Sequence, residues 1–387
     1  MIITIIIFIL VLSVLVFVHE LGHFYTARRC GVKAEEFGLG FPPRLFGWYK
    51  NKAGRWRYFF SRRSVESLEN DLDENIRLGD GQTVYSLNAL PIGGFVKIKG
   101  ENGEGKDEID SFGYQKIWRK VVILSAGVVM NVILAWFLLS LGFMIGLPQA
   151  VQSPDSQISL SEAQLNISEV SPGSPAERAG LQSGDVILRV DGLSPVSDSS
   201  LQEMIAARAG QEVELAISRA GQDLSLTVVP ESASAGEGAT IGIAFFFSGL
   251  AKHGFFPAFW EGAKMTTWLL VEIFRAFGNL FQQLLSGQSV SGEFAGPVGI
   301  AAITGQAARL GLAHLLQFAA LLSLNLAVLN ILPFPALDGG RILFLLIEKI
   351  KGSPVKKEFE AVVHNAGFLF LIGLVIFITY KDIIKLF

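Results

Sequence analysis

Two histidines and a glutamate near the N-terminus have the types and spacing of a metal-dependent hydrolytic site. His19-Glu20-Leu21-Gly22-His23 is an HExxH sequence. On a helix, residues four positions apart share one face, so both imidazoles can bind one zinc ion, and Glu20 can act as general base on water. The alternative interpretation is a group of polar residues where a helix leaves the bilayer.

A catalytic zinc site needs a third protein ligand and an open position. The chain has one cysteine, Cys30, which excludes a cysteine-based zinc site. Three further histidines are available, but Asp338 is the better candidate. The other histidines are His253, His314 and His364.

The residues around Asp338 support this choice. They read Asn330-Ile-Leu-Pro-Phe-Pro-Ala-Leu-Asp338-Gly-Gly. The two prolines break a helix, and the two glycines allow close backbone approach. Broken backbone at membrane depth is tolerated only where it lines a cavity or is packed in protein. The alternative role for Asp338 is a helix cap or a turn residue.

The elements that position these residues are apolar enough to span a membrane. Half of the residues are hydrophobic, mean hydropathy is +0.45, and 17% are charged, against about 25% in soluble proteins. About 20 apolar residues cross a bilayer core of ~30 Å as a helix. Four stretches qualify: Met1–Val18, Val121–Leu147, Leu312–Leu332 and Ala361–Tyr380. A cleaved signal peptide is disfavoured because the first stretch lacks a basic leader and a small-residue cleavage site.

Basic residues indicate the orientation of these spans. The segment Arg28–Lys120 holds 17 of the 32 lysines and arginines, whereas Pro148–Gly311 holds 8 and Arg341–Lys357 holds 5. The first and third connections are therefore expected in the cytoplasm, with both termini outside. His19 then lies roughly 27 Å from the outer end of its helix, near the cytoplasmic edge where Asp338 also emerges.

The connections contain further elements. Thr83–Lys99 predicts a β-hairpin around Pro91–Gly94, and the pattern alone favours an ordinary cytoplasmic hairpin. Phe255–Leu285 is rich in aromatic residues but carries charges, which predicts a helix lying in the membrane interface; a fifth span is the alternative. The outer connection predicts a small α+β or barrel-like unit. Its expected strands are Leu165–Val170, Asp185–Val190, Val213–Ser218 and Leu224–Val229, with helices at Ala176–Ala179 and Leu201–Arg208 and a turn at Ala220–Gly221.

HExxH at the end of a first span, followed by NxxPxPxLDGG at the end of a later one, resembles the site-2 protease family of intramembrane metalloproteases, in particular its bacterial regulator-of-sigma-E protease branch. The resemblance implies that His19, His23 and Asp338 bind one Zn²⁺ and that Glu20 is the catalytic base. It places Asn330 near the substrate, and Asn325 could do similar work.

Other segments extend the resemblance. Leu87–Lys99 is similar to the family's membrane-associated β-hairpin, with Gly93 and Gly94 as expected substrate-binding residues. Ser168–Asp191 resembles a PDZ domain, and Ile241–Ile243 could close its peptide groove. The best-known members of the branch carry two PDZ domains, whereas this connection has room for one.

The implied fold is a polytopic α-helical membrane protein with about four transmembrane helices, a membrane-associated β-hairpin and one α+β PDZ domain. The expected organisation is a first span at 1–27, a cytoplasmic loop at 28–115 with the hairpin at 83–99, a second span at 116–147, a PDZ domain at 150–247, an interfacial amphipathic region at 255–310, a third span at 311–350 and a fourth at 361–385.

The implied function is hydrolysis of peptide bonds within or near transmembrane segments, for example of an anti-sigma factor or remnant signal peptides. Expected partners are single-span membrane substrates, a peptide or trimmed substrate terminus on the PDZ domain, and the lipid bilayer. The net charge of −3 gives no reason to expect nucleic acid. The expected location is a bacterial inner membrane, with the PDZ domain extracytoplasmic and the active site near the cytoplasmic side. The alternatives are a non-catalytic PDZ scaffold and a metal transporter.

Overall fold

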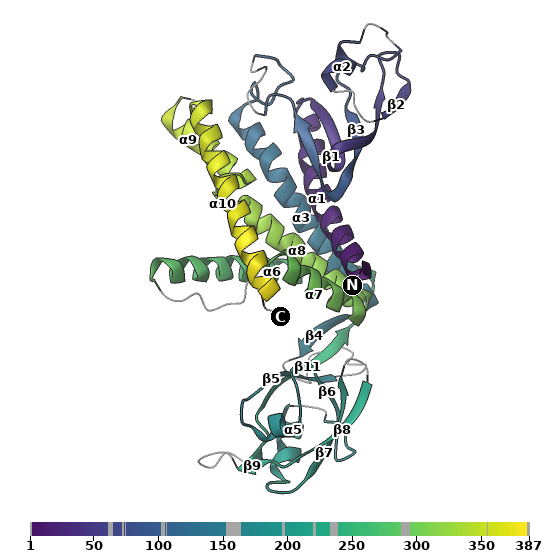
Figure 1. Cartoon of the computed structure of the whole chain (residues 1–387), viewed down its shortest axis with the longest axis vertical. Coiled ribbons are helices and arrows are strands. Elements are labelled where there is room, and N and C mark those ends of the chain that lie inside the picture. The colour runs from purple at the N-terminus through teal and green to yellow at the C-terminus, as the bar shows by residue number, and fades with distance from the viewer. Residues whose placement is uncertain are drawn as a thin grey trace. The chain divides into compact units, whose positions relative to one another are not determined.

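The computed structural model divides the chain into two compact units (Figure 1). Unit 1 consists of Met1–Leu141 and Phe259–Phe387, and unit 2 of Gly142–Ala258. The structure describes residues 2–60, 65–71, 73, 75–101, 105, 107–151, 164–195, 198–219, 222–232, 239–287, 295–353 and 355–384.

Within these residues, four helices are long and apolar enough to cross a membrane, the number that the sequence predicts. They are α1 (Ile2–Arg29), α3 (Ile117–Ile145), α8 (Leu312–Ile331) and α10 (Lys357–Ile384). Aliphatic side chains of the first three pack together, with Val11 and Leu15 of α1 against Ala319 of α8 and Leu134 of α3. This packing places α1, which carries the HExxH sequence, beside α8, which leads into the broken segment before Asp338.

The remaining helices that lie wholly or mostly in unit 1 are α2 (Val65–Glu69), α6 (Phe255–Leu285), α7 (Pro297–Leu310) and α9 (Asp338–Lys351). Helix α6 is not among the candidate spans, and it runs crosswise to α10 (Figure 1). Its tryptophans Trp260 and Trp268 are exposed. By length and composition, α6 is therefore not a fifth candidate span.

A three-stranded sheet in the order β2-β1-β3 follows α1. Its strands are β1 (Ala34–Lys50), β2 (Trp56–Phe60) and β3 (Val84–Ile98). The chain reverses within β3 near Pro91, as the sequence predicts, but the pairing differs from a simple hairpin. Leu39 of β1 is opposite both Gly94 and Leu87, so the two arms of β3 flank β1. The local sequence pattern predicts the reversal in β3 but not that β1 lies between its two arms.

The turn of β3 lies against α1. Ser13 donates a hydrogen bond from Oγ to the carbonyl oxygen of Pro91 at 2.6 Å. A Cβ atom added at Gly93 would lie 2.8 Å from Cγ1 of Val16, so a glycine is required for this approach. The turn therefore sits alongside a candidate span, within two helical turns of His19.

Unit 2 contains a six-stranded sheet in the order β4-β11-β5-β6-β7-β8. These strands are β4 (Leu147–Val151), β5 (Gln164–Val170), β6 (Val186–Val190), β7 (Val213–Arg219), β8 (Gln222–Val228) and β11 (Ile243–Ala251), with α4 (Pro175–Arg178), α5 (Asp198–Ala206) and a short pair, β9 (Glu231–Ser232) and β10 (Ala239–Thr240). The expected strands and helices are present within a few residues. The predicted turn Ala220–Gly221 lies outside the described residues.

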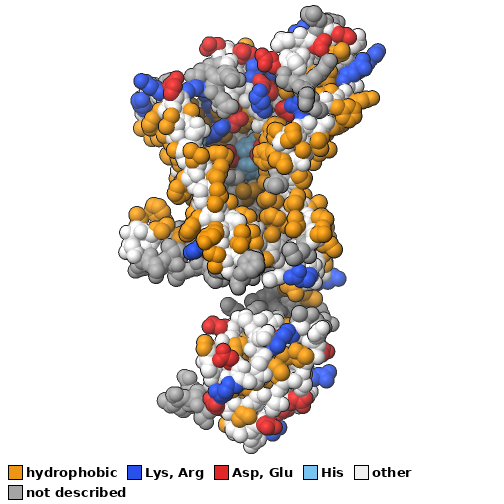
Figure 2. Space-filling model, viewed as in Figure 1, with side chains coloured by type: hydrophobic (Ala, Val, Ile, Leu, Met, Phe, Trp, Pro, Cys, Tyr) orange, Lys and Arg blue, Asp and Glu red, His pale blue; other side chains and the backbone are white. Residues whose placement is uncertain are grey.

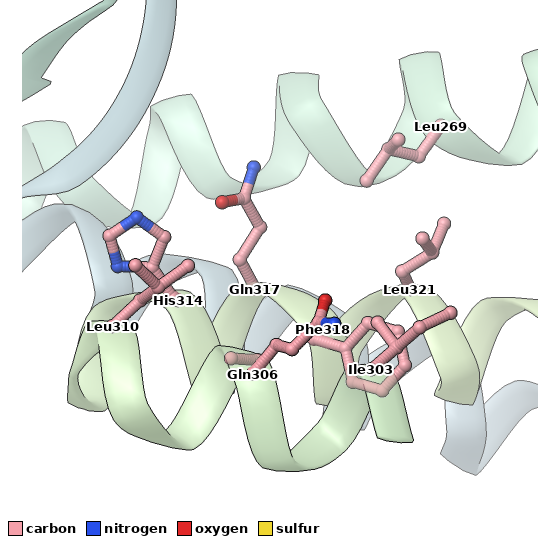
Figure 3. Close-up of a pocket in the computed structure, with 9 residues that line it drawn as sticks. Leu269, Ile303, Gln306, Leu310, His314, Gln317, Phe318 and Leu321 are labelled. Atoms are coloured by element: carbon pink, nitrogen blue, oxygen red, sulfur yellow. The ribbon is translucent and has the colours of Figure 1, made fainter. Parts of the chain in front are cut away.

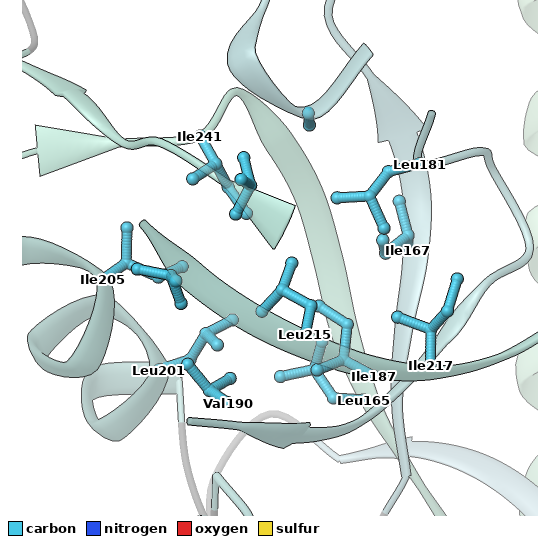
Figure 4. Packing of buried hydrophobic residues seen from close by; sticks show 13 residues of the cluster. Leu165, Ile167, Leu181, Ile187, Val190, Leu201, Ile205, Leu215, Ile217 and Ile241 are labelled. Carbon is cyan, nitrogen blue, oxygen red and sulfur yellow. The ribbon is translucent and has the colours of Figure 1, made fainter. Parts of the chain in front are cut away.

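The core of unit 2 is built by alternation along its strands (Figure 4). Val213, Leu215 and Ile217 of β7 are all fully buried, because every second side chain of a strand points to one face. Leu201 of α5 belongs to the same buried cluster. Unit 2 thus has a hydrophobic core of its own.

Candidate metal centre

His19, His23 and Asp338 converge at one point in unit 1, and they are the one group of potential metal ligands found among the described residues. The Nε2 atoms of the histidines are 3.1 Å apart. Oδ2 of Asp338 lies 3.1 Å from Nε2 of His19 and 3.4 Å from Nε2 of His23. Both histidines are buried, and the aspartate is partly accessible.

These separations fit a zinc ion. Ligand atoms at the zinc distance of ~2.0–2.1 Å in a tetrahedron lie about 3.3 Å from one another, close to the values observed here. The donor set, two imidazole nitrogens and one carboxylate oxygen, is also one that catalytic zinc sites use. Three ligands leave a fourth position for water or substrate, as a hydrolytic site requires.

Helix α3 fixes the orientation of both imidazoles. Nδ1 of His23 lies 2.8 Å from the carbonyl oxygen of Ile123, which can only accept a hydrogen bond. The ring nitrogen Nδ1 therefore carries the proton, and the neutral ring presents a bare Nε2 towards Asp338. A metal ligand needs this tautomer, and such an outer hydrogen bond is what selects it.

Asn131 plays the corresponding part for His19. Its amide nitrogen Nδ2 lies 3.3 Å from Nδ1 of His19, and its Oδ1 is buried without a hydrogen-bond partner. Amide orientations are assigned from the hydrogen bonds that they allow. The opposite orientation lets Oδ1 accept from the Nδ1–H of His19, which satisfies the buried oxygen and leaves Nε2 bare for a metal.

Glycines bring α3 close enough for these contacts. A Cβ atom at Gly127 would lie 2.4 Å from Nε2 of His23 and 2.7 Å from Nε2 of His19. A Cβ at Gly22, between the two histidines, would lie 2.5 Å from the carbonyl oxygen of Ala126. Any larger residue at Gly127 would thus intrude into the space where the three ligand atoms meet.

Glu20 is held by the sheet. The backbone N–H of Val96, in the arm of β3 after the turn, donates to Oε2 of Glu20 at 3.2 Å. The carboxylate is partly buried. One oxygen of Glu20 therefore has a fixed partner, and the glutamate lies directly beside the first histidine in the sequence.

Asp338 is positioned by the break between α8 and α9. Helix α8 ends at Ile331, and α9 begins at Asp338. A Cβ at Gly339 would lie 2.2 Å from the carbonyl oxygen of Leu332, and one at Gly340 would lie 2.3 Å from that of Phe334. The expected need for two glycines is confirmed, because the broken segment folds directly over them.

The candidate substrate-binding residues separate into two groups. Nδ2 of Asn330 lies 3.5 Å from Nε2 of His19, at the edge of the ligand cluster. Asn325 donates instead to the carbonyl oxygen of Leu321 in its own helix at 3.0 Å. Gly93 packs on Val16 of α1, three residues before His19, and Gly94 lies close to the carbonyl oxygen of Gly38 in β1.

A hollow with hydrophobic walls opens on one face of unit 1, with histidine and acidic side chains at its floor (Figure 2). A separate pocket of about 270 Å³ lies between α6, α7 and α8 (Figure 3). Its polar lining residues are Gln306, His314 and Gln317. It shares no residue with the ligand cluster.

Sequence reasoning missed Asn131 and Gly127. Asn131 had a visible signal, because a polar residue inside an uncharged span is costly and usually functional. Gly127 had none, since a glycine in an apolar helix is common and its role depends on what the neighbouring helix carries.

Comparisons with known proteins extend these findings. The model of peptidase family M50 matches residues 7–62 and 75–374. The regulator of sigma-W protease RasP of Bacillus subtilis is 29% identical and covers 99% of both chains. A putative zinc metalloprotease of Clostridium perfringens is 33% identical, covering 97% of both chains, and one of Nostoc is 33% identical over 97% of this chain and 94% of the relative.

Among solved structures, the PDZ domain of an SdrC-like protein from Listeria innocua is similar to 21% of this chain and covers 92% of that chain, with 20% identity and a TM-score of 0.20.

Proposed function

The chain belongs to peptidase family M50, and from this premise we propose that His19, His23 and Asp338 hold its zinc while Glu20 is the general base. The chain is a multi-pass membrane protein and an intramembrane zinc metalloprotease. The observation that carries the residue assignment is the convergence of two Nε2 atoms and one carboxylate oxygen within 4.8 Å, beside Glu20.

Zinc, when bound, supplies a Lewis acid that polarises a carbonyl oxygen and favours deprotonation of water. Glu20 accepts the proton from water on a carboxylate oxygen and returns it to the amine nitrogen of the leaving peptide. The hydrogen bond from the backbone N–H of Val96 restrains one carboxylate oxygen of Glu20. Ile123 and Asn131 keep the histidine rings turned with Nε2 towards the metal.

The substrate must be extended at the site, because the carbonyls of a helix are hydrogen-bonded within it. Addition of a strand to the sheet would hold the extended form through backbone hydrogen bonds. The β3 arm that contains Val96 is next to Glu20, which makes it the suitable arm. Asn330, beside His19, would bind the backbone of the unwound segment.

The proposed membrane arrangement places the active site near the cytoplasmic side of a bacterial inner membrane. The basic connections after α1 and α9 support this orientation. The turn of β3 lies against Ser13 and Val16 of the span α1, which supports a sheet that enters the bilayer. Exposed aromatic residues of β2, Tyr58 and Phe60, suit the lipid interface.

We assign unit 2 as an extracytoplasmic PDZ domain that admits substrates whose outer domain has been trimmed. Its small antiparallel sheet with two short helices supports this assignment. The substrates would be single-span membrane proteins such as anti-sigma factors, in keeping with the relative named regulator of sigma-W protease, or remnant signal peptides. Deleting residues 161–230 should allow cutting of untrimmed substrates, and continued protection of these substrates would contradict the gating role.

Zinc content tests the ligand assignment. Protein purified in detergent should contain one zinc per chain, and His19→Ala, His23→Ala and Asp338→Asn should each lose most of it. His253→Ala is the matched control, because this histidine belongs to unit 2. Full retention of zinc by Asp338→Asn would refute the assignment of the third ligand.

A further inference from the structure

Helix α10 contacts the broken segment before Asp338 at three successive points, and none of these contacts involves a ligand of the metal. The residues on α10 are His364, Gly367 and Phe370. Their spacing of three places them along one side of the helix. The segment itself, Leu332–Leu337, has no regular secondary structure, so its conformation depends on what packs against it.

We propose that His364 is a positioning residue, which holds the segment before Asp338 and thereby sets the place of the third zinc ligand. The inference rests on the proposed role of Asp338 as that ligand. It assigns to the fourth span a part in metal binding, although α10 supplies no atom to the ligand cluster.

The central contact is a hydrogen bond into the segment. The backbone N–H of Ala336 donates to Nδ1 of His364 at 2.8 Å. Ala336 has a φ of 76°, in the left-handed region that is unfavourable for a residue other than glycine. Such a conformation persists only when surrounding contacts hold it. Ala336 is two residues from Asp338, so its backbone direction controls where α9 and its first carboxylate begin.

The histidine ring has no other described hydrogen bond. Because Nδ1 accepts, the proton of the neutral ring lies on Nε2. Nε2 is buried and has no hydrogen-bond partner; the nearest carboxylate oxygen, Oε1 of Glu360, is 3.9 Å away. A buried donor without a partner is unfavourable. A histidine used only for stability would be expected to satisfy both nitrogens, so the bond to Ala336 is the distinctive feature.

Two neighbouring contacts reinforce the hydrogen bond. A Cβ atom at Gly367 would lie 2.5 Å from Cβ of Pro335 and 2.7 Å from its carbonyl oxygen, so α10 presses directly on the segment. The rings of Phe370 and Phe334 are in contact, with centroids 5.8 Å apart. The ring of His364 is itself fixed by Phe344 of α9 at 5.5 Å. The segment is therefore packed between α10 and α9.

The geometry of a metal site tolerates little displacement. Ligands must be held within about 0.5 Å of their productive positions by packing and outer hydrogen bonds. Loss of an outer partner typically lowers metal affinity about 10- to 100-fold. Loosening the segment should act in the same way as loss of an outer partner, because it frees the backbone that carries Asp338.

The test compares zinc affinity in full-length protein in detergent, measured by competition with a chelator. His364→Leu should weaken zinc binding by about 10- to 100-fold. His364→Asn should restore most of the affinity, because asparagine carries an acceptor, Oδ1, on Cγ where histidine carries Nδ1. In cobalt-substituted protein, the visible absorption bands should shift in His364→Leu and return in His364→Asn.

A second pair of variants keeps the test decisive if His364→Leu folds poorly. Gly367→Ala should weaken zinc binding, since its methyl group would displace Pro335. Gly373→Ala is the matched control on the same helix, because a Cβ there meets nothing within 4 Å. Thermal unfolding of each variant verifies that the fold is retained.

Unchanged zinc affinity and an unchanged cobalt spectrum in folded His364→Leu would overturn the inference, as would unchanged values in Gly367→Ala. The underlying ligand assignment is tested separately by Asp338→Asn. If that variant loses zinc while the α10 variants keep it, only the positioning role fails. If Asp338→Asn also keeps zinc, the ligand assignment fails with it.

Discussion

Nε2 of His19 and Oδ2 of Asp338 lie 3.1 Å apart although 319 positions separate these residues in the chain. No single helix brings His19 and Asp338 together. Helix α1 packs on α8 through aliphatic side chains, and α8 breaks so that α9 starts beside the histidines. The site therefore depends on the packing of α1 against α8 and on the break between α8 and α9.

Gly127 gives the first prediction. Gly127→Ala should abolish zinc binding, because the added methyl group would lie 2.4 Å from Nε2 of His23 and close to Nε2 of His19. Zinc content after purification is the measurement. Gly278→Ala on α6, where a Cβ meets nothing within 4 Å, is the control. A Gly127→Ala protein with a full zinc content would mean that the ligands meet elsewhere.

Asn131 gives the second prediction. Asn131→Ala removes the partner of Nδ1 of His19, so the ring loses its fixed tautomer and orientation. Zinc affinity should fall by about 10- to 100-fold. Asn325→Ala is the matched control, because Asn325 bonds only to its own helix among its described hydrogen bonds. Equal affinities of the two variants would show that the bond to His19 does not matter for the metal.

The third prediction concerns unit 2. Asp185 is buried and accepts hydrogen bonds from Arg219 and from the backbone N–H of Gln182. Burial raises the pKa of this carboxyl, but the hydrogen bonds and the charge of Arg219 outweigh it, so the pKa lies below its usual value of 3.8. A lowered pKa in the folded state means that the carboxylate stabilises the fold above pH 3.8 and that this stabilisation is lost as the pH falls below it.

Asp185→Asn should therefore lower the Tm of a fragment carrying residues 142–258 by roughly 5 °C at pH 7. The difference from the wild type should shrink at pH 3, because protonation then weakens the wild-type carboxylate as well. Circular dichroism melts measure both values, and Asp223→Asn on the exposed side of β8 is the control. A difference that stays constant from pH 7 to pH 3 would show that the charge of Asp185 is not involved.

The three candidate ligands could be predicted from the sequence, because their residue types occur in recognisable patterns. His19 and His23 have helical spacing, and Asp338 follows two prolines and precedes two glycines, which together predict a break that presents a side chain. The spans followed from uninterrupted apolar runs. These features are local, so a single sequence is enough to predict them.

The supporting residues could not be predicted in the same way. Gly127 and His364 act through contacts between helices that are far apart in the sequence, and their residue types have many ordinary roles. The prediction that the two arms of β3 pair directly with each other was wrong. The reversal at Pro91 is encoded by the local sequence, whereas the position of β1 between the arms depends on residues far away in the chain. Tertiary packing decided each of these features.

The most direct test of the central claim is cleavage of a tagged single-span membrane protein by wild type and Glu20→Gln in detergent, with zinc content measured in both. Gln keeps the size of Glu20 but cannot accept a proton, so both proteins should hold one zinc per chain. Only the wild type should cut, with the rate of the variant lower by about 10²- to 10⁴-fold. Equal cutting by the two zinc-loaded proteins would contradict the role of Glu20 and the site built around it.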